Sequence, residues 1–303
     1  MKKLMIICLA VLLVFSAQAA ELTDAMGRVI SFDASPHRVT ALLGSYGEVW
    51  LAAGGTLIAT TEDAVDTPAA QAQGEVANLG DHSHVSLEQL LSLEPDFAIL
   101  SADTAAHVAL GDALEDAGVP CGYFSVTDWR EYMALLKNFT ALTGRDDLYL
   151  AQVETVQQPI EALLAQAQKS PEYGEQTALL LRAYVTSVRA KDSESTVAGR
   201  ILKDMGLVNI ADGDDLLAEN LTMEAIIMAD PDYIFAVTMG ADEEGAVRML
   251  EQTLLNNPAW NTLTAVREGR FIMLERDLFH YRPNARWAEA YEAVWEKVYE
   301  QEH

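Results

Sequence analysis

The sequence predicts an α/β protein of two Rossmann-like lobes, with mostly parallel sheets, joined by a long interdomain helix. Three observations predict this fold class. Short apolar runs typical of buried strands alternate with helical segments along the chain. A unit of strand-and-helix signals occurs twice, once in each half. Between the two copies lies a helical stretch over 146–169, which would cover roughly 35 Å at 1.5 Å per residue.

The N-terminal half contains the first part of the alternation. Gly54-Gly55 and Gly118 are expected to end two helices, because glycine is the usual residue after a helix C-terminus. The segment Gly44-Ser45-Tyr46-Gly47 is expected to connect the first strand to the first helix. The expected strands are 38–42, 57–60, 97–100 and 123–126, and the expected helices are 48–53 and 105–117.

A long helix is expected between the halves. Pro159 is the main interruption of the stretch 146–169, and a proline inside a helix kinks or splits it. The alternation resumes after Pro171 with apolar runs at 177–181 and 271–274. We therefore expect an N-terminal lobe over 20–143, an interdomain helix over 144–172 and a C-terminal lobe over 173–303. Two such lobes would leave a ligand cleft between them.

The repeated unit supports two related lobes. Residues 86–100 and 222–236 each begin with Ser or Thr, have Glu two positions later, and pass through an acidic-Pro-Asp step into an apolar run. The interval is the same in both copies, from Glu88 to Pro95 and from Glu224 to Pro231. A matched pair on either side of a long helix indicates two lobes of related architecture.

Residues 1–19 are typical of a secretory signal peptide. Lys2 and Lys3 precede an apolar run over 4–15, and Ala17-Gln18-Ala19 supplies a small-x-small cleavage pattern. The apolar run is too short to span a bilayer. Ile7 stands before Cys8, where a lipidated cysteine would follow a small residue. We expect cleavage after Ala19 without lipidation, and a periplasmic or secreted protein.

Composition excludes several classes of function. Hydrophobic residues make up 50% of the chain, which is typical of a globular protein. Acidic residues outnumber basic ones by 46 to 20, so no basic face is expected that could bind nucleic acid. Cys121 is the only cysteine after the leader. An internal disulfide is therefore excluded, and we expect a small buried residue there rather than a catalytic thiol.

A series of segments, taken in order along the chain, carries a family resemblance. These segments are Asp24–Arg28, Pro36–Val39, the two repeated units, Leu254–Trp260, Val266–Arg270 and Phe279–Trp287. With them the sequence resembles the substrate-binding proteins of ABC importers for iron-siderophores, haem and cobalamin, the class with a rigid interdomain helix. The resemblance covers nearly the whole chain after the leader. It implies a ligand between the lobes, small hinge motion, no intrinsic cofactor and no catalytic residue. It also implies a monomer that delivers its ligand to a membrane permease dimer with ATPase subunits.

Candidate ligand-binding residues follow the expected strands, because ligands of open α/β sheets collect at the carboxyl ends of strands. Aromatic side chains would supply flat apolar contact, and arginines would hold carboxylates or other anionic oxygens. Each candidate has an ordinary alternative role as a surface or packing residue. The set is Tyr46, Glu62, His82, His84, Trp129, Arg182, Tyr184, Arg189, Arg276, His280 and Tyr281.

The histidines leave alternatives open. His82 and His84 could place two imidazoles at a metal ion or be solvated surface residues, and His280 or Tyr281 could ligate a haem iron. The sequence has no HExxH, paired CxxC, phosphate-binding glycine loop or GxSxG pattern. The alternative functions are an enzyme of unrecognised type and a metal-ion-binding protein that uses His82 and His84.

Glu88 and Glu224 have two interpretations. A carboxylate in the first turn of a helix interacts favourably with the helix dipole, by roughly 0.3–1 kcal/mol. The resemblance implies a second role, because equivalent glutamates on the two lobes contact basic residues of the importer's membrane subunits. We expect docking, at a point away from the strand ends where the ligand lies. The expected function is an extracytoplasmic solute-binding protein for an iron-siderophore or a related metal chelate such as haem or cobalamin.

Overall fold

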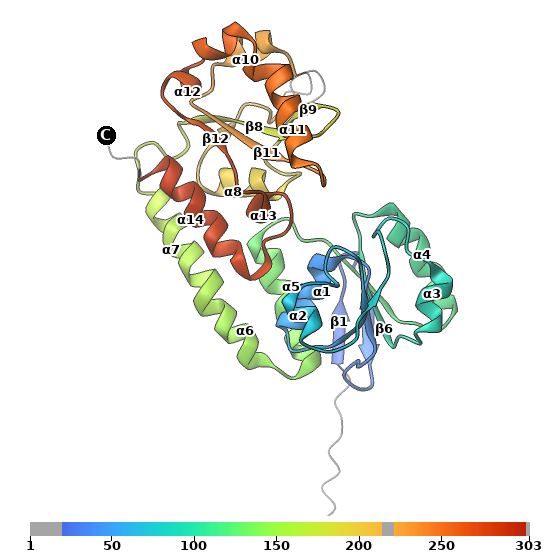
Figure 1. Cartoon of the computed structure of the whole chain (residues 1–303). Coiled ribbons are helices and arrows are strands. Elements are labelled where there is room, and N and C mark those ends of the chain that lie inside the picture. Colours follow the sequence, from blue (N-terminus) through green and yellow to red (C-terminus); the bar gives the residue numbers. More distant parts are fainter. Residues whose placement is uncertain (1–19, 214–220, 301–303) are drawn as a thin grey trace, which may run out of the picture.

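The N-terminal lobe of the computed structural model is a parallel sheet with helices on both faces (Figure 1). The structure describes residues 20–213 and 221–300, so the predicted leader over 1–19 lies outside it. The strand order is β5-β4-β3-β6-β7, and all neighbours are parallel. The strands are β3 (Val39–Ala41), β4 (Leu57–Thr60), β5 (Ala77–Asn78), β6 (Phe97–Ser101) and β7 (Cys121–Phe124), and an antiparallel pair, β1 (Ala20–Thr23) and β2 (Val29–Phe32), precedes them.

The helices of this lobe follow the strands in turn. They are α1 (Gly44–Ala52), α2 (Pro68–Gln71), α3 (Leu87–Ser92), α4 (Ala105–Asp116) and α5 (Trp129–Thr143). Helix α1 begins at Gly44, whereas the sequence predicted a connection over 44–47. The two glycines belong to the helix because it packs closely: a Cβ on Gly44 would lie 2.6 Å from Asp63 Oδ2, and one on Gly47 3.1 Å from Ala41 Cβ. Because glycine has no Cβ, Gly44 and Gly47 let the helix pack closely against its neighbours, and they do not form a turn.

The C-terminal lobe repeats the architecture, except that one of its five strands is antiparallel. Its parallel strands have the order β10-β8-β11-β12, and β9 pairs antiparallel with β8. The strands are β8 (Thr177–Ala183), β9 (Val188–Lys191), β10 (Val208–Asn209), β11 (Tyr233–Thr238) and β12 (Phe271–Met273). The helices include α8 (Val197–Asp204), α10 (Met223–Ala229), α11 (Glu243–Leu250), α12 (Thr264–Arg267), α13 (Arg276–Phe279) and α14 (Trp287–Val298), with shorter turns at Glu251–Leu255, Pro258–Thr262 and Asn284–Arg286. The predicted fold class is confirmed.

The repeated unit has the same stereochemistry in both lobes. Glu94 and Asp230, the residues before the two prolines, both have positive φ, at 47° and 37°. The aspartate after each proline accepts hydrogen bonds from the start of the lobe's first parallel strand. Asp96 accepts from the N–H of Arg38 at 2.9 Å, and Asp232 from the N–H of Thr177 at 2.8 Å. The acidic-Pro-Asp step therefore ends a helix and also ties its loop to a neighbouring strand.

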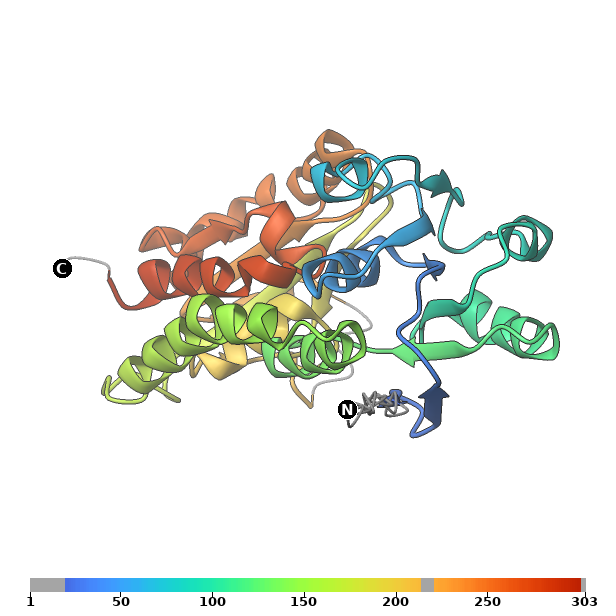
Figure 2. The same ribbon diagram turned by 90° about the horizontal axis from the view of Figure 1, so that it is seen from below.

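The interdomain helix is continuous through Pro159. It consists of α6 (Asp146–Gln152), a π-helical turn (Val153–Gln157) and α7 (Gln158–Ala167). Pro159 is the second residue of α7 and directly follows the π-helical turn. Its missing N–H is tolerated there because the pattern of backbone hydrogen bonds changes at the π-helical turn. Helix α14 runs beside α7, as both views show (Figure 2).

One hydrophobic core runs through both lobes. It contains side chains of the N-terminal sheet and α5, of the interdomain helix, of α14 and of the C-terminal sheet, among them Trp50, Phe97, Phe139, Ile160, Leu180, Phe235, Trp287 and Tyr291. The outer face of each sheet packs in a separate smaller cluster. Moving one lobe away from the other would expose part of the shared core to water, at a cost of roughly 25 cal/mol per Å² of apolar surface. The lobes are therefore held in one relative position.

Candidate functional site

The carboxyl ends of the two sheets meet at one segment of chain, residues 276–284. This segment follows β12, and α13 lies between the lobes in Figure 1. His280 lies near Thr238, the last residue of β11, and near Arg182 of β8. Two residues later, Arg282 donates from Nε to the carbonyl of Val126 beyond β7, at 2.6 Å. Since two residues span about 7 Å at most, the strand ends of both lobes lie close to this segment.

The C-terminal lobe contributes a basic set of side chains to this site, Arg182, Arg189 and Arg276, here called the C-terminal wall. Arg182 and Arg189 are directly opposite each other on β8 and β9, so their side chains leave the same face of the sheet. Arg189 was expected to follow a strand, and it lies within β9 instead. The guanidinium of Arg189 lies 5.9 Å from the ring centre of Tyr184, which is half-buried just beyond β8. No ion pair joins Arg182, Arg189 or Arg276 to a carboxylate of the described residues.

His280 is a neutral imidazole at the centre of this basic wall. Burial and the positive charges of Arg276 and Arg182 lower the pKa of His280 to about 4. Its ring stacks on the exposed ring of Tyr281, with centroids 4.0 Å apart. The Nδ1 atom is buried and, within 20–213 and 221–300, has no hydrogen-bond partner; the same holds for Nε of Arg182.

The N-terminal wall is more closed than the sequence suggested. Tyr46 is fully buried and its hydroxyl donates to the carbonyl of Phe124 at 2.9 Å. Burial raises the pKa of Tyr46 to about 12, and Arg282 covers its ring at 4.9 Å. Trp129 begins α5 with its side chain in the core. The prediction that Tyr46 and Trp129 offer open aromatic faces is corrected, since both are packing residues.

The histidine loop of the N-terminal lobe forms no metal centre in the described residues. His84 is exposed and its Nδ1 lies 3.1 Å from Asp81 Oδ1, while His82 Nδ1 lies 3.9 Å from Asp81 Oδ2. These contacts lower the pKa of Asp81, chiefly through hydrogen bonds from Ser83 and then from His84. No group of three or more potential metal ligands comes together anywhere in 20–213 and 221–300. Glu62 is exposed beyond β4, in a different loop.

A buried histidine that sequence reasoning missed supports this loop. His107 Nδ1 accepts from the Ser101 N–H at 3.0 Å, and its Nε2 bonds the carbonyl of His82 at 2.8 Å. The first contact requires an unprotonated Nδ1, and burial lowers the pKa of His107 accordingly. A pocket of about 190 Å³ lies beside it, lined by His82, Ser83, Val85, Ala106, His107, Ala109 and Leu110. In the sequence, the position of His107 on the apolar face of a predicted helix is the one signal that could have indicated that it supports this loop.

Glu88 and Glu224 are exposed in the first turns of α3 and α10. Ser86 and Thr222 cap these helices by accepting from the N–H groups of Gln89 and Ala225. A helix between parallel strands runs antiparallel to them, so it starts at the edge where the strands end. The expectation that the glutamates lie away from the strand ends is therefore wrong, because both lie at the edge of their sheets where the strands end.

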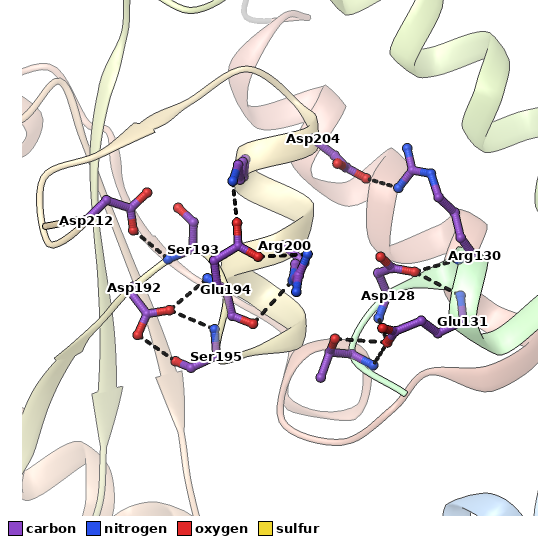
Figure 3. A network of polar contacts seen from close by, with 12 residues as sticks. Asp128, Arg130, Glu131, Asp192, Ser193, Glu194, Ser195, Arg200, Asp204 and Asp212 are labelled. Atoms are coloured by element: carbon purple, nitrogen blue, oxygen red, sulfur yellow. Dashed lines mark hydrogen bonds and ion pairs between the residues drawn. The ribbon is translucent and has the colours of Figure 1, made fainter. Parts of the chain in front are cut away.

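A second polar contact joins the lobes at the far side of α14. Asp204, at the end of α8, accepts from Arg130 Nη1 at 2.8 Å and from the Tyr291 hydroxyl at 2.7 Å. Figure 3 shows this pair beside a separate network in which Asp192 and Glu194 organise the loop before α8. Burial and Asp204 raise the pKa of Tyr291, so its hydroxyl stays protonated and donates. None of these residues was predicted as functional.

Two further features bear on function. Cys121 is buried, and burial raises the pKa of its thiol to about 12, so the prediction of an inert core residue is confirmed. Across the described stretches, no helix is both long enough and apolar enough to cross a bilayer.

The fold and this interlobe site define a class of protein, and comparison with known proteins agrees. Residues 39–278 match the family described as periplasmic binding protein. That match covers more than half of the chain, and the chain belongs to this family. A curated relative, the putative ABC transporter substrate-binding lipoprotein YhfQ of Bacillus subtilis, is 23% identical over 225 residues. The alignment covers 70% of this chain and 66% of that relative, so the chain spans just under two thirds of its length.

Solved structures share the whole fold at low sequence identity. SirA of Staphylococcus aureus complexed with staphyloferrin B has a TM-score of 0.70 and 16% identity, covering 92% of this chain and 98% of that one. A periplasmic heme binding protein of Pseudomonas aeruginosa has a TM-score of 0.68 and 21% identity, covering 88% and 94%. IsdE of S. aureus complexed with heme has a TM-score of 0.70 and 13% identity, covering 87% and 99%. At these identities the likeness establishes the two-lobed fold.

Proposed function

We propose that this chain is the substrate-binding protein of an ABC importer and captures a metal chelate, an iron-siderophore or a related compound such as haem or cobalamin, in the interlobe cleft. The observation that carries the proposal is the gathering of Arg182, Arg189 and Arg276 with Tyr184 and Tyr281 at the strand ends. In a chain of net charge −26, basic side chains without ion-pair partners among the described residues favour an anionic ligand. The B. subtilis relative is named a putative ABC transporter substrate-binding lipoprotein, which supports a transport role. One solved relative holds staphyloferrin B and another is a periplasmic heme binding protein, which supports a metal chelate as the ligand.

The basic wall favours anionic chelates over neutral ones. Carboxylate groups of a ferric siderophore, or the propionates of haem, would each accept charge-assisted hydrogen bonds from arginine, whereas a neutral corrinoid would gain less. The ring pair of His280 and Tyr281 would lie against a planar or bulky ligand. His280, neutral at pH 7, or Tyr281 would also be available to a haem iron.

Delivery would involve a permease dimer and its ATPase subunits, with Glu88 and Glu224 as docking groups, one on each lobe. We further propose that the protein is monomeric, lies outside the cytoplasm and reaches that location by cleavage of residues 1–19. It would have no catalytic residue. The metal-ion alternative at His82 and His84 gains no support from the described side chains, where no set of three metal ligands gathers.

Calorimetric titration tests the proposed function. Purified protein is titrated with haemin, with ferric citrate, with a ferric catecholate and with cyanocobalamin. We expect one-to-one binding of an anionic chelate and a thermal stabilisation that grows with ligand concentration, about 2.7 kcal/mol at a hundredfold excess over Kd. A visible-range spectrum of protein from its native host identifies the ligand class independently. Lack of binding to every probe, together with a measurable hydrolytic or redox activity, would overturn the transport function.

A further inference from the structure

The segment that carries His280 and Tyr281 belongs to the C-terminal lobe but is fastened to the N-terminal lobe. Arg282 makes three contacts there: Nε donates to the Val126 carbonyl at 2.6 Å, Nη2 lies 3.3 Å from Asp103 Oδ2, and the guanidinium covers the ring of Tyr46 at 4.9 Å. Its side chain is 20% exposed, so these contacts are partly shielded from water. One residue therefore bonds a backbone carbonyl, a carboxylate and an aromatic face of the other lobe.

Asn284 makes the second attachment. Its Nδ2 donates to the carbonyl of Ser45 at 3.0 Å and to Glu48 Oε2 at 2.7 Å, both on α1. Asn284 is 8% exposed and has a φ of 49°, in the left-handed region that costs energy for a residue other than glycine. Both hydrogens of the amide are used in bonds to α1, and Asn284 makes them from this backbone conformation. The strain is therefore associated with a specific interlobe contact.

These attachments lie two and four residues from His280. We propose that Arg282 and Asn284 are positioning residues, which clamp segment 276–284 to the N-terminal lobe and so hold His280 and Tyr281 in the cleft in one arrangement before ligand binds. The role in ligand capture rests on the proposed function, whereas the clamp itself does not. Without the clamp, the binding-competent arrangement is populated only part of the time, and the apparent Kd rises by the reciprocal of that fraction.

Two variants remove the clamp in different ways. Asn284→Gly keeps a residue that tolerates positive φ and removes both amide donors. Arg282→Lys keeps the positive charge but loses the planar group that bonds Val126 and covers Tyr46. Hydrogen–deuterium exchange of the ligand-free protein should show amides of 276–284 exchanging at least about fivefold faster in each variant, with the global melting temperature little changed. The affinity for whichever of haemin and ferric citrate binds the wild type should fall about tenfold.

Arg130→Gln is the matched control, because it removes a different interlobe contact, to Asp204, without touching segment 276–284. It should leave exchange of that segment and ligand affinity at wild-type values. A rescue pair tests the Asn284 contact directly. Asn284→Asp places two carboxylates together and should loosen the segment, and adding Glu48→Gln restores a donor to that contact and should recover at least half of the lost protection.

The outcomes separate the clamp from the proposed function. Unchanged exchange in both Asn284→Gly and Arg282→Lys would overturn the clamp, and so would an equal rise in Arg130→Gln, which would mean general loosening of the lobes. Faster exchange with unchanged affinity would overturn the positioning role. If neither haemin nor ferric citrate binds the wild type, that result counts against the proposed function, while the exchange experiment still decides on the clamp.

Discussion

Arg182, Arg189 and Arg276, the three arginines of the C-terminal wall, form no ion pair with a described carboxylate, unlike most other described basic residues. Arginines 28, 130, 145, 200, 248, 270, 282 and 286 all form ion pairs with described carboxylates. Arg182 and Arg189 instead face each other across two strands. Like charges directly opposite on a sheet are unfavourable unless something else stabilises them. An anionic ligand would do so.

Removing one side of this wall should weaken binding without unfolding the protein. Tyr184→Ala combined with Arg189→Ala should raise the Kd of the bound chelate at least about tenfold, since a charge-assisted contact is worth roughly 1.5–3 kcal/mol. The melting temperature should stay nearly unchanged, because Arg189 is exposed and Tyr184 only half-buried. Calorimetry and a thermal melt provide both readings. Arg248→Ala, on α11, is the control and should change neither; a large loss of melting temperature with wild-type affinity would contradict the placement.

His280 should make stability depend on pH. Its folded-state pKa of about 4 lies below the ordinary value of 6.5. Between these two values the unfolded chain binds a proton that the folded chain does not, so the contribution of His280 is complete above pH 6.5 and is lost as pH falls toward 4. In urea unfolding, the stability difference between wild type and His280→Gln should be larger at pH 7 than at pH 5, by about 1 kcal/mol after allowing for the half-exposed ring. Equal differences at the two pH values would contradict a depressed pKa.

At the scale of elements, short capped helices set the edges of the cleft. α3 and α10 have the same Ser or Thr cap, the same exposed glutamate in the first turn and the same positive-φ residue before proline. The cap satisfies a backbone N–H, and the positive-φ residue reverses the chain toward the next strand. The same local interactions thus produce the same geometry in both lobes. They leave one exposed carboxylate at an equivalent point of each lobe, Glu88 on α3 and Glu224 on α10.

Charge reversal at these two helices should separate docking from ligand binding. The double variant Glu88→Lys, Glu224→Lys should abolish uptake and complex formation with the permease, while chelate affinity stays within about twofold, because neither residue belongs to the arginine wall. Stability should fall by a few tenths to about 1 kcal/mol per site, since a cation opposes the helix dipole. Glu→Gln at both sites is the control and should weaken docking less. Normal transport by the double Lys variant would leave the glutamates as helix-start residues only.

The whole molecule combines two lobes with one core. Because the apolar cluster continues from the N-terminal sheet through α7 and α14 into the C-terminal sheet, relative motion of the lobes is restricted. The ion pair of Arg130 with Asp204 and the attachments of Arg282 and Asn284 join the lobes at separate places. Ligand entry is therefore expected to need side-chain movement rather than a wide hinge opening.

Export should remove residues 1–19. Intact-mass measurement of the protein purified from its native host should give a chain that begins at Ala20 with no added lipid. The small-x-small pattern at Ala17-Gln18-Ala19 supports this, although the B. subtilis relative is named a lipoprotein. A mass that includes a diacylglyceryl group would contradict it. Expression with Cys8→Ser is the control, since the mature mass should be unchanged.

Local patterns in the sequence determined the fold class because they report physics within a few residues. Alternating apolar runs and helix caps depend on near neighbours, so β4 was predicted over its full length of 57–60 and the paired units were recognised. The predicted connection over 44–47 was wrong because the glycines of α1 serve close packing against Asp63 and Ala41. These two residues come near the glycines only when the chain folds. The strand expected at 123–126 is present for the same local reason, although it begins two residues earlier, at Cys121.

Tertiary structure alone decided which candidates share a site. Tertiary contacts bring together six of them: Arg182, Tyr184, Arg189, Arg276, His280 and Tyr281. They meet because β8 ends and the antiparallel β9 begins at the sheet edge beside which α13 lies. Tyr46 and Trp129 have equally suitable side chains but are buried by core packing. Asn284 and Glu48 bond across 236 residues of sequence, a separation at which no local pattern carries information. Composition and periodicity specify which surface of an element is buried, but the partner that covers it depends on the folded chain as a whole.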